Sequence, residues 1–140
     1  MTSPVYTAEA RVTGGRADGH GRTADGQLAV DLRLPKELGG DREGTNPEQL
    51  FAVGYAGCFA SVLDMLVRKQ NLDTDVTIDS RVLLNRGEDG TFTLGVELDI
   101  ELPAVPDAAR LVGSAHELCP YSRAIRGNVD VTLIVNGARQ

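Results

Sequence analysis

The sequence has very few cysteines. Its 140 residues include only two, Cys58 and Cys119. A chain of this length can bury a hydrophobic core without disulfides or metal, so two cysteines exclude a disulfide-dependent scaffold. Without a secretion signal, an isolated pair of cysteines is more often redox-active than structural. The pair therefore directs attention to thiol chemistry.

Positive charge is also scarce. Fourteen Lys and Arg face twenty Asp and Glu, which gives a net charge of −6, and no basic run occurs. This balance argues against a nucleic-acid or anionic-membrane partner. Residues 1–6 contain neither a basic nor an apolar segment, and the uncharged run 50–63 is shorter than the roughly 20 residues of a membrane span. We therefore expect a soluble, cytoplasmic protein.

Motifs of several common catalytic classes are missing. His20 and His116 do not combine with the cysteines at a zinc-binding spacing. Gly14-Gly15 is not a phosphate-binding loop, and no Gly-x-Ser-x-Gly sequence is present. Metal-free thiol chemistry remains, and we expect no bound metal or cofactor.

Alternating apolar and polar residues predict an α+β protein with antiparallel sheet. Residues 6–12 and 28–34 show the strand period, and a glycine-rich loop is expected at 14–21 between them. The remaining predicted elements are a helix over 46–69, a long hairpin over 76–84 and 92–102, a helix from 106 to 118 and a strand over 129–135. The predicted order is βββ-α-ββ-α-β in one domain, residues 1–140, with the bounds of one of the first three strands left open.

The segment 46–69 predicts a buried helix. Asn46 suits the N-cap, Pro47 the first helical position, and Gln49 completes a spacing like that of a capping box. The helix is apolar nearly all round through residue 63, so every face must be covered. Small residues would let a second helix approach closely: Gly54, Ala56, Gly57 and Ala60.

Cys58 lies in the middle of this apolar helix. It could pack as a small hydrophobic residue, because free cysteines are usually buried. Burial also raises the pKa of a thiol, so a reactive Cys58 needs a nearby cation. Arginine stays charged when desolvated, and the candidates are Arg16, Arg22, Arg123 and Arg126. We favour Arg16, which follows Gly14-Gly15, although a solvated turn arginine would look the same.

Glu48 and Cys119 complete the candidate site. Glu48 can orient an arginine, but it also suits the first turn of a helix through the helix dipole. Cys119 precedes Pro120, so it should be extended and cap a short helix over 120–126. A thiol near a helix N-terminus ionises more easily, which suits a resolving cysteine.

Taken together, these motifs resemble the organic hydroperoxide resistance proteins (Ohr), a branch of the Ohr/OsmC superfamily. The similar segments cover almost the whole chain: 5–10, 13–16, 35–40, Thr45 to Phe59 with Gly54-Tyr55-Ala56-Gly57-Cys58, and Ala115 to Val131 with Cys119-Pro120-Tyr121-Ser122. The resemblance implies an OsmC-like fold, with antiparallel sheets around a long central helix in an intertwined homodimer.

The resemblance also implies a thiol peroxidase for organic and fatty-acid hydroperoxides. Cys58 would be the peroxidatic cysteine and Cys119 the resolving one, with Arg16 stabilising the thiolate and Glu48 positioning Arg16. A dihydrolipoyl group on a lipoylated protein would reduce the disulfide. The loop 15–22 is one residue longer than the family pattern, so Arg22 stays an alternative to Arg16. Apolar residues near the helix should line the substrate pocket: Phe51, Tyr55, Phe59 and Tyr121.

Two other functions use the same residues. One is a dimeric protein that binds hydrophobic ligands without turnover, and the other is a peroxide sensor that signals through a disulfide. The sensor lacks a basic or DNA-reading element. Ten helical residues separate Glu48 from Cys58 by about 15 Å, which a glutamate cannot span. We therefore expect Glu48 to act through a long arginine or on the Cys58 of a second chain, in a two-fold symmetric homodimer.

Overall fold

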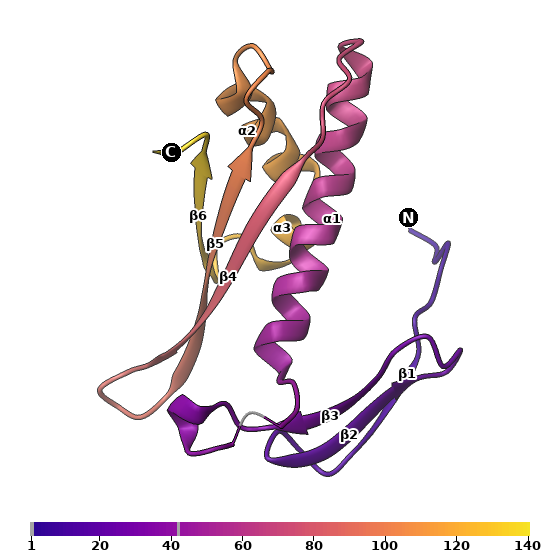
Figure 1. The fold of residues 1–140 in the computed structure, drawn as a ribbon, viewed down its shortest axis with the longest axis vertical. Helices are drawn as coiled ribbons and strands as arrows, with labels where there is room; N and C mark the ends of the chain where they lie inside the picture. Colours follow the sequence, from indigo (N-terminus) through magenta and orange to yellow (C-terminus); the bar gives the residue numbers. More distant parts are fainter. Residues whose placement is uncertain (1, 42) are drawn as a thin grey trace. The chain divides into compact units, whose positions relative to one another are not determined.

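Three antiparallel strands form the first sheet. The computed structural model describes residues 2–41 and 43–140, and its strands β1 (Ala10–Thr13), β2 (Asp18–Thr23) and β3 (Ala29–Arg33) pair in the order β1-β2-β3 (Figure 1). A short 3-10 helix, η1 (Lys36–Leu38), follows. These elements belong to the first of two compact units, which ends at Leu50, while the second begins at Phe51.

Strand β2 occupies residues 18–21 of the segment 14–21 that the sequence predicted to be a glycine-rich loop, so that prediction was wrong for its second half. Gly19 and Gly21 take the two buried positions of β2. A Cβ at Gly19 would overlap the carbonyl oxygen of Gly15, which explains why this inward position has no side chain. The strand predicted over 6–12 is also shorter, since β1 begins at Ala10.

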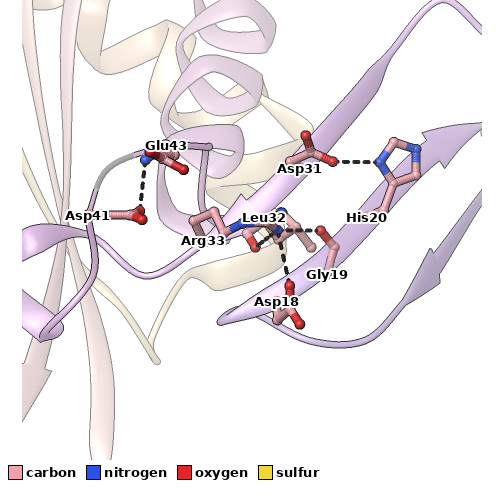
Figure 2. Close-up of polar contacts among 8 residues, drawn as sticks. All are labelled: Asp18, Gly19, His20, Asp31, Leu32, Arg33, Asp41 and Glu43. Atoms are coloured by element: carbon pink, nitrogen blue, oxygen red, sulfur yellow. Dashed lines mark hydrogen bonds and ion pairs between the residues drawn. The ribbon is translucent and has the colours of Figure 1, made fainter.

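Polar side chains of β2 and β3 form hydrogen bonds and ion pairs across the strand pair (Figure 2). The His20 ring Nδ1 lies 3.0 Å from a carboxylate oxygen of Asp31, its cross-strand neighbour. The Arg33 guanidinium donates to the carbonyl oxygens of Gly19 and Leu32. These contacts are exposed or partly buried, so we expect each to contribute modestly to stability.

The segment before α1 (Pro47–Lys69) is tied to β3. The amide of Arg33 donates to the Thr45 carbonyl at 2.8 Å, and the Thr45 amide donates to the Asp31 carbonyl at 2.9 Å. The Asn46 Oδ1 then accepts the Gln49 amide at 2.9 Å, which confirms Asn46 as the N-cap. The Gln49 side chain accepts a hydrogen bond from the Thr45 hydroxyl. The first helical turn, which carries Glu48, is therefore anchored to the first sheet.

Replacing Asn46 tests this anchor. Asn46 is buried, so Asn46→Ala should lower the free energy of unfolding by about 1 kcal/mol, the usual cost of losing an N-cap. Urea unfolding followed by circular dichroism measures the change. Asn46→Asp keeps a capping oxygen and should stay close to the wild type, whereas equal losses in both variants would contradict the capping role.

Helix α1 is uninterrupted from Pro47 to Lys69. It ends where the sequence predicted, because Asn71 adopts a left-handed conformation with φ 57°. The amide of Asn71 donates to Arg68 and that of Leu72 to Val67, the two bonds of a Schellman motif. By length and composition α1 could cross a membrane. One of its stripes lies in the core of the second unit, as in core helices of soluble proteins: Tyr55, Phe59, Leu63 and Val67.

The second sheet has the order β4-β5-β6-β7. Strands β4 (Thr77–Arg86) and β5 (Phe92–Glu101) form the predicted antiparallel hairpin (Figure 1). Strand β6 (Asp130–Val135) pairs parallel to β5, and the short β7 (Ala138–Arg139) pairs antiparallel to β6. The sheet is therefore mixed rather than purely antiparallel. The helices α2 (Ala108–Leu118) and α3 (Pro120–Ile125) lie in the crossover between β5 and β6, which allows the parallel return.

The core of the second unit packs helices against one face of this sheet. Alternate residues of β5 are buried there together with one stripe of α2 and the α1 stripe. The buried stripe of α2 consists of Ala108, Leu111, Val112 and Ala115, whereas Leu118 at the end of the same helix is half exposed. Cys119 is one of the buried residues of this core, and Cys58 is partly buried against it.

Candidate active site

The structure brings the two cysteines into contact. Cys58 lies in the middle of α1, and Cys119 joins α2 to α3. Their Sγ atoms are 3.7 Å apart, with the Cys119 thiol donating to Cys58, and neither forms a disulfide. Cys119 is completely buried, whereas Cys58 is partly exposed. Of the two cysteines, Cys58 is therefore the one that a molecule from solvent can reach.

The chain turns sharply at Cys119. Its backbone is extended, with φ −62° and ψ 124°, because Pro120 follows and disfavours a helical conformation. Its amide closes α2 on the Ala115 carbonyl, and its carbonyl accepts the Arg123 amide of α3. The predicted short helix after Cys119 is therefore confirmed, and Cys119 ends one helix and caps the next.

The surroundings of Cys58 in the second unit do not activate it. Burial raises the pKa of the Cys58 thiol, and its hydrogen bond and charge interaction with Cys119 act in the same direction. A hydrogen bond from the Tyr121 backbone amide, in the first turn of α3, acts in the opposite direction. The pKa of Cys58 is raised overall. A reactive Cys58 therefore still needs a nearby cation, as the sequence analysis expected.

Four aromatic rings of the second unit form one cluster around Tyr55. Tyr55 contacts the rings of Phe51, Phe59 and Tyr121, with centroid distances of 5.9, 6.4 and 5.8 Å. Tyr55 and Phe59 are completely buried, whereas Phe51 is partly buried and Tyr121 is 40% exposed. Among these four rings, Phe51 and Tyr121 therefore present the surface that a ligand can touch.

A chain of hydrogen bonds, buried at Tyr55 and Ser122 and partly buried at His116, lies near the cysteines, and the sequence analysis missed it. The Tyr55 hydroxyl is 2.6 Å from the Ser122 hydroxyl, which is 2.9 Å from Nδ1 of His116. Burial and the Arg126 charge lower the pKa of His116, so its ring is neutral at pH 7. Tyr55 is 67 residues from Ser122 in sequence, so the chain of bonds gives no periodic signal, although each of its three residues lies three positions from a cysteine.

Arg16 and Glu48 form a bidentate ion pair in the first unit. The guanidinium nitrogens lie 2.9 and 3.1 Å from the two carboxylate oxygens. The hydrogen bond from Arg16 holds the pKa of Glu48 below its ordinary value, and Glu48 raises that of Arg16. Both groups are therefore charged at neutral pH, and Glu48 fixes the direction of the Arg16 fork.

The loop that carries Arg16 depends on glycine. Gly14 has φ 72°, and a Cβ there would overlap the Asp18 carbonyl oxygen. The other candidate arginines have different surroundings. Arg22 lies on β2 beside Gly26, and Arg126 binds the His116 carbonyl and Glu117. Arg16 is the candidate that the structure pairs with Glu48.

The site is a pair of reduced cysteines in contact, in an α+β fold. The family model described as OsmC-like protein matches residues 39–134. The chain belongs to this family, and the resemblance to its organic hydroperoxide resistance branch is confirmed.

The relatives support this assignment along nearly the whole chain. The chain is 45% identical to the organic hydroperoxide resistance protein OhrB of Bacillus subtilis over 92% of its length and 96% of that protein. It is 46% identical to the organic hydroperoxide resistance protein of Xanthomonas axonopodis pv. citri, covering 95% and 98%. A crystal structure of an organic hydroperoxide resistance protein from Legionella pneumophila has a TM-score of 0.88 at 47% identity, covering 95% and 98%.

Proposed function

We propose that this protein is a cysteine-based thiol peroxidase that reduces organic hydroperoxides to alcohols. The observation that carries the proposal is the contact between a partly exposed and a fully buried cysteine, 3.7 Å apart. The relatives named for organic hydroperoxide resistance supply the substrate class. Cys58 is the nucleophile, because its sulfur is the accessible one, and Cys119 is the resolving thiol.

The first step consumes the peroxide. The Cys58 thiolate attacks the distal oxygen of ROOH, a sulfur–oxygen bond forms, and the oxygen–oxygen bond breaks. The RO⁻ leaving group takes a proton and departs as an alcohol, while Cys58 becomes a sulfenic acid. Sulfur is oxidised by two electrons and the peroxide is reduced by two.

The second step forms a disulfide. Cys119 attacks the Cys58 sulfur, and the hydroxyl leaves as water with the proton of the Cys119 thiol. The disulfide protects Cys58 from further oxidation to sulfinic acid. An external dithiol then restores both thiols by exchange. We propose a dihydrolipoyl group on a lipoylated protein as this reductant, with no cofactor bound by the chain itself.

Activation of Cys58 is assigned to Arg16. Within the second unit, burial and Cys119 raise the Cys58 pKa, so a cation from elsewhere must favour the thiolate. Arg16 is suited to this role because Glu48 orients its guanidinium in a two-point contact. An arginine held by a carboxylate loses little freedom when it meets a thiolate.

Apolar contacts at the site favour organic peroxides over hydrogen peroxide. Phe51 and Tyr121 are the partly exposed rings of the aromatic cluster around Tyr55. Each methylene that a substrate buries against such a surface contributes about 0.8 kcal/mol. Hydrogen peroxide has no carbon and gains nothing from this term.

We also propose a homodimer, located in the cytoplasm. Helix α1 is continuous, so about 15 Å separates Glu48 from Cys58 along its axis. A glutamate side chain cannot span this distance, so Glu48 would serve the Cys58 of a second chain or act through a long arginine. The same helix leaves an apolar face open: Val53 is 76% exposed, and a Cβ at Gly57 would meet nothing within 4 Å. Small residues one turn apart suit the close approach of a second copy.

The dimer is tested at Val53. Val53→Glu should convert the dimer to a monomer, because an ionised carboxylate would be buried in the contact. Light scattering with sedimentation measures the mass. Leu38→Glu is the control, since Leu38 is also exposed but lies in η1. A wild-type protein that is a stable, fully active monomer would refute the dimer.

The proposed activity is tested by turnover. The wild-type protein with dihydrolipoamide should consume many equivalents of cumene hydroperoxide and far less hydrogen peroxide per unit time. A protein that only binds hydrophobic ligands would consume none, and a sensor without recycling would stop after one equivalent. Either of these two outcomes would contradict the proposal.

A further inference from the structure

We infer that Tyr55, Ser122 and His116 form a positioning clamp that holds Cys119 within reach of Cys58. The clamp is the hydrogen-bonded chain beside the cysteines. Its role in turnover rests on the proposed peroxidase function, whereas its effect on the approach of the two sulfurs does not.

The clamp connects the three helices that carry the cysteines. Tyr55 belongs to α1, His116 to α2 and Ser122 to α3. The Ser122 hydroxyl is the node, at 2.6 Å from the Tyr55 hydroxyl and 2.9 Å from the His116 ring. A shift of one helix relative to the others would break at least one of these bonds.

The sequence positions of the clamp follow those of the cysteines. Tyr55 precedes Cys58 by three residues on α1, one helical turn away. His116 precedes Cys119 by three residues, and Ser122 follows it by three. Each hydrogen bond of the clamp therefore acts within about one turn of a sulfur atom.

Burial makes the clamp specific. Tyr55 and Ser122 have no exposed surface, so a broken bond would leave a polar group without water. A serine hydroxyl has one proton, so with two partners it donates to one and accepts from the other. Burial raises the pKa of Tyr55 and lowers that of His116, so both are neutral at pH 7. The clamp binds through neutral hydrogen bonds and brings no charge to the thiols.

A second contact supports the same geometry. The Arg126 guanidinium, just after α3, donates to the His116 carbonyl at 2.9 Å and lies 3.4 Å from the Glu117 carboxylate. Both ends of α3 are thus bound to the last turn of α2. Cys119 lies at the corner between them.

The consequence is the fate of oxidised Cys58. Its sulfenic acid either condenses with Cys119, releasing water, or reacts with a second peroxide to give sulfinic acid. The branch depends on how often the Cys119 sulfur is in reach. A clamp that keeps the sulfurs together favours the disulfide.

The test measures closure without peroxide. Excess 2,2′-dithiodipyridine is added to the reduced full-length protein, and thiopyridone release is followed by absorbance. Cys58 exchanges first and releases one thiopyridone. Cys119 then displaces the second from the Cys58 mixed disulfide, and this phase reports the approach of the two sulfurs. Ser122→Ala should slow it about tenfold, the size expected for loss of a buried hydrogen bond.

Matched variants separate positioning from general stability. Tyr55→Phe removes only the hydroxyl, keeps the ring in the core, and should also slow the second phase. Ile100→Val removes one methylene from a fully buried β5 residue, and Ser114→Ala removes an exposed α2 hydroxyl. In both variants the Cys58–Cys119 disulfide should form at the wild-type rate. Closure of Ser122→Ala and Tyr55→Phe at the wild-type rate, or equal slowing in Ile100→Val, would overturn the clamp.

Peroxide treatment distinguishes the clamp from the peroxidase proposal. With limiting dithiol, Ser122→Ala should accumulate more Cys58 sulfinic acid than the wild type, as measured by mass spectrometry. A wild-type protein that closes normally with dithiodipyridine but does not consume peroxide would refute the peroxidase and leave the clamp intact. Normal peroxide consumption with unchanged sulfinic acid in Ser122→Ala would refute the effect of the clamp on turnover.

Discussion

Cys58→Ser should reduce hydroperoxide turnover to the uncatalysed rate, whereas Cys119→Ser should still reduce about one equivalent per active site. The reason is the difference in exposure between the two thiols. Cys58 is partly exposed and can attack a peroxide, while Cys119 is completely buried and can reach only Cys58. Rapid mixing with cumene hydroperoxide, followed by peroxide quantification, measures both stoichiometries.

The product state gives the second half of this test. After the first equivalent, Cys119→Ser should hold Cys58 as sulfenic acid and then convert it to sulfinic acid, which dithiols do not reverse. The wild type in the same peroxide should contain a Cys58–Cys119 disulfide, visible by mass spectrometry. Indistinguishable behaviour of the two variants in a single turnover would refute the assigned roles.

Arg16→Ala should slow peroxide reduction strongly at neutral pH and much less at alkaline pH. If Arg16 favours the thiolate, its loss raises the Cys58 pKa. Below both pKa values, the thiolate fraction and hence the rate fall about tenfold for each unit of that rise. Above both values the thiol is ionised in either protein, so the rates converge. The rate of the first step, measured across pH, reports the shift.

Two further variants locate this effect. Arg22→Ala removes the alternative arginine on β2 and should leave the pH profile unchanged. Glu48→Gln removes the charge that orients Arg16, so it should reproduce part of the Arg16→Ala defect. A defect of Arg16→Ala that does not vary with pH, or a larger effect of Arg22→Ala, would move the role away from Arg16.

Sequence reasoning succeeded where local chemistry decides the structure. Helix α1 starts at the capping residue Asn46 and Pro47, and it ends before the left-handed Asn71. Each of these residues acts on backbone within about one helical turn of its own position. The hairpin β4–β5 follows from its alternating pattern. Pro120 similarly marks the turn after Cys119.

Strand β2 shows where the pattern fails. Its inward positions are Gly19 and Gly21, which look like loop residues in a sequence because they have no side chain. At Gly19 the reason is the neighbouring backbone, because a Cβ there would overlap the carbonyl oxygen of Gly15. Such crowding arises only when the strands are assembled.

The sequence by itself determined the helix that carries Cys58, the corner that carries Cys119, and the family. Each depends on residues that are neighbours in the chain or on motifs that can be recognised in the amino-acid sequence. Tertiary structure decided the 3.7 Å contact of the two sulfurs, the Arg16–Glu48 pair and the Tyr55–Ser122–His116 chain. Most of these contacts join residues distant in sequence and so leave no periodic trace, because they form only when the folded chain brings the residues together.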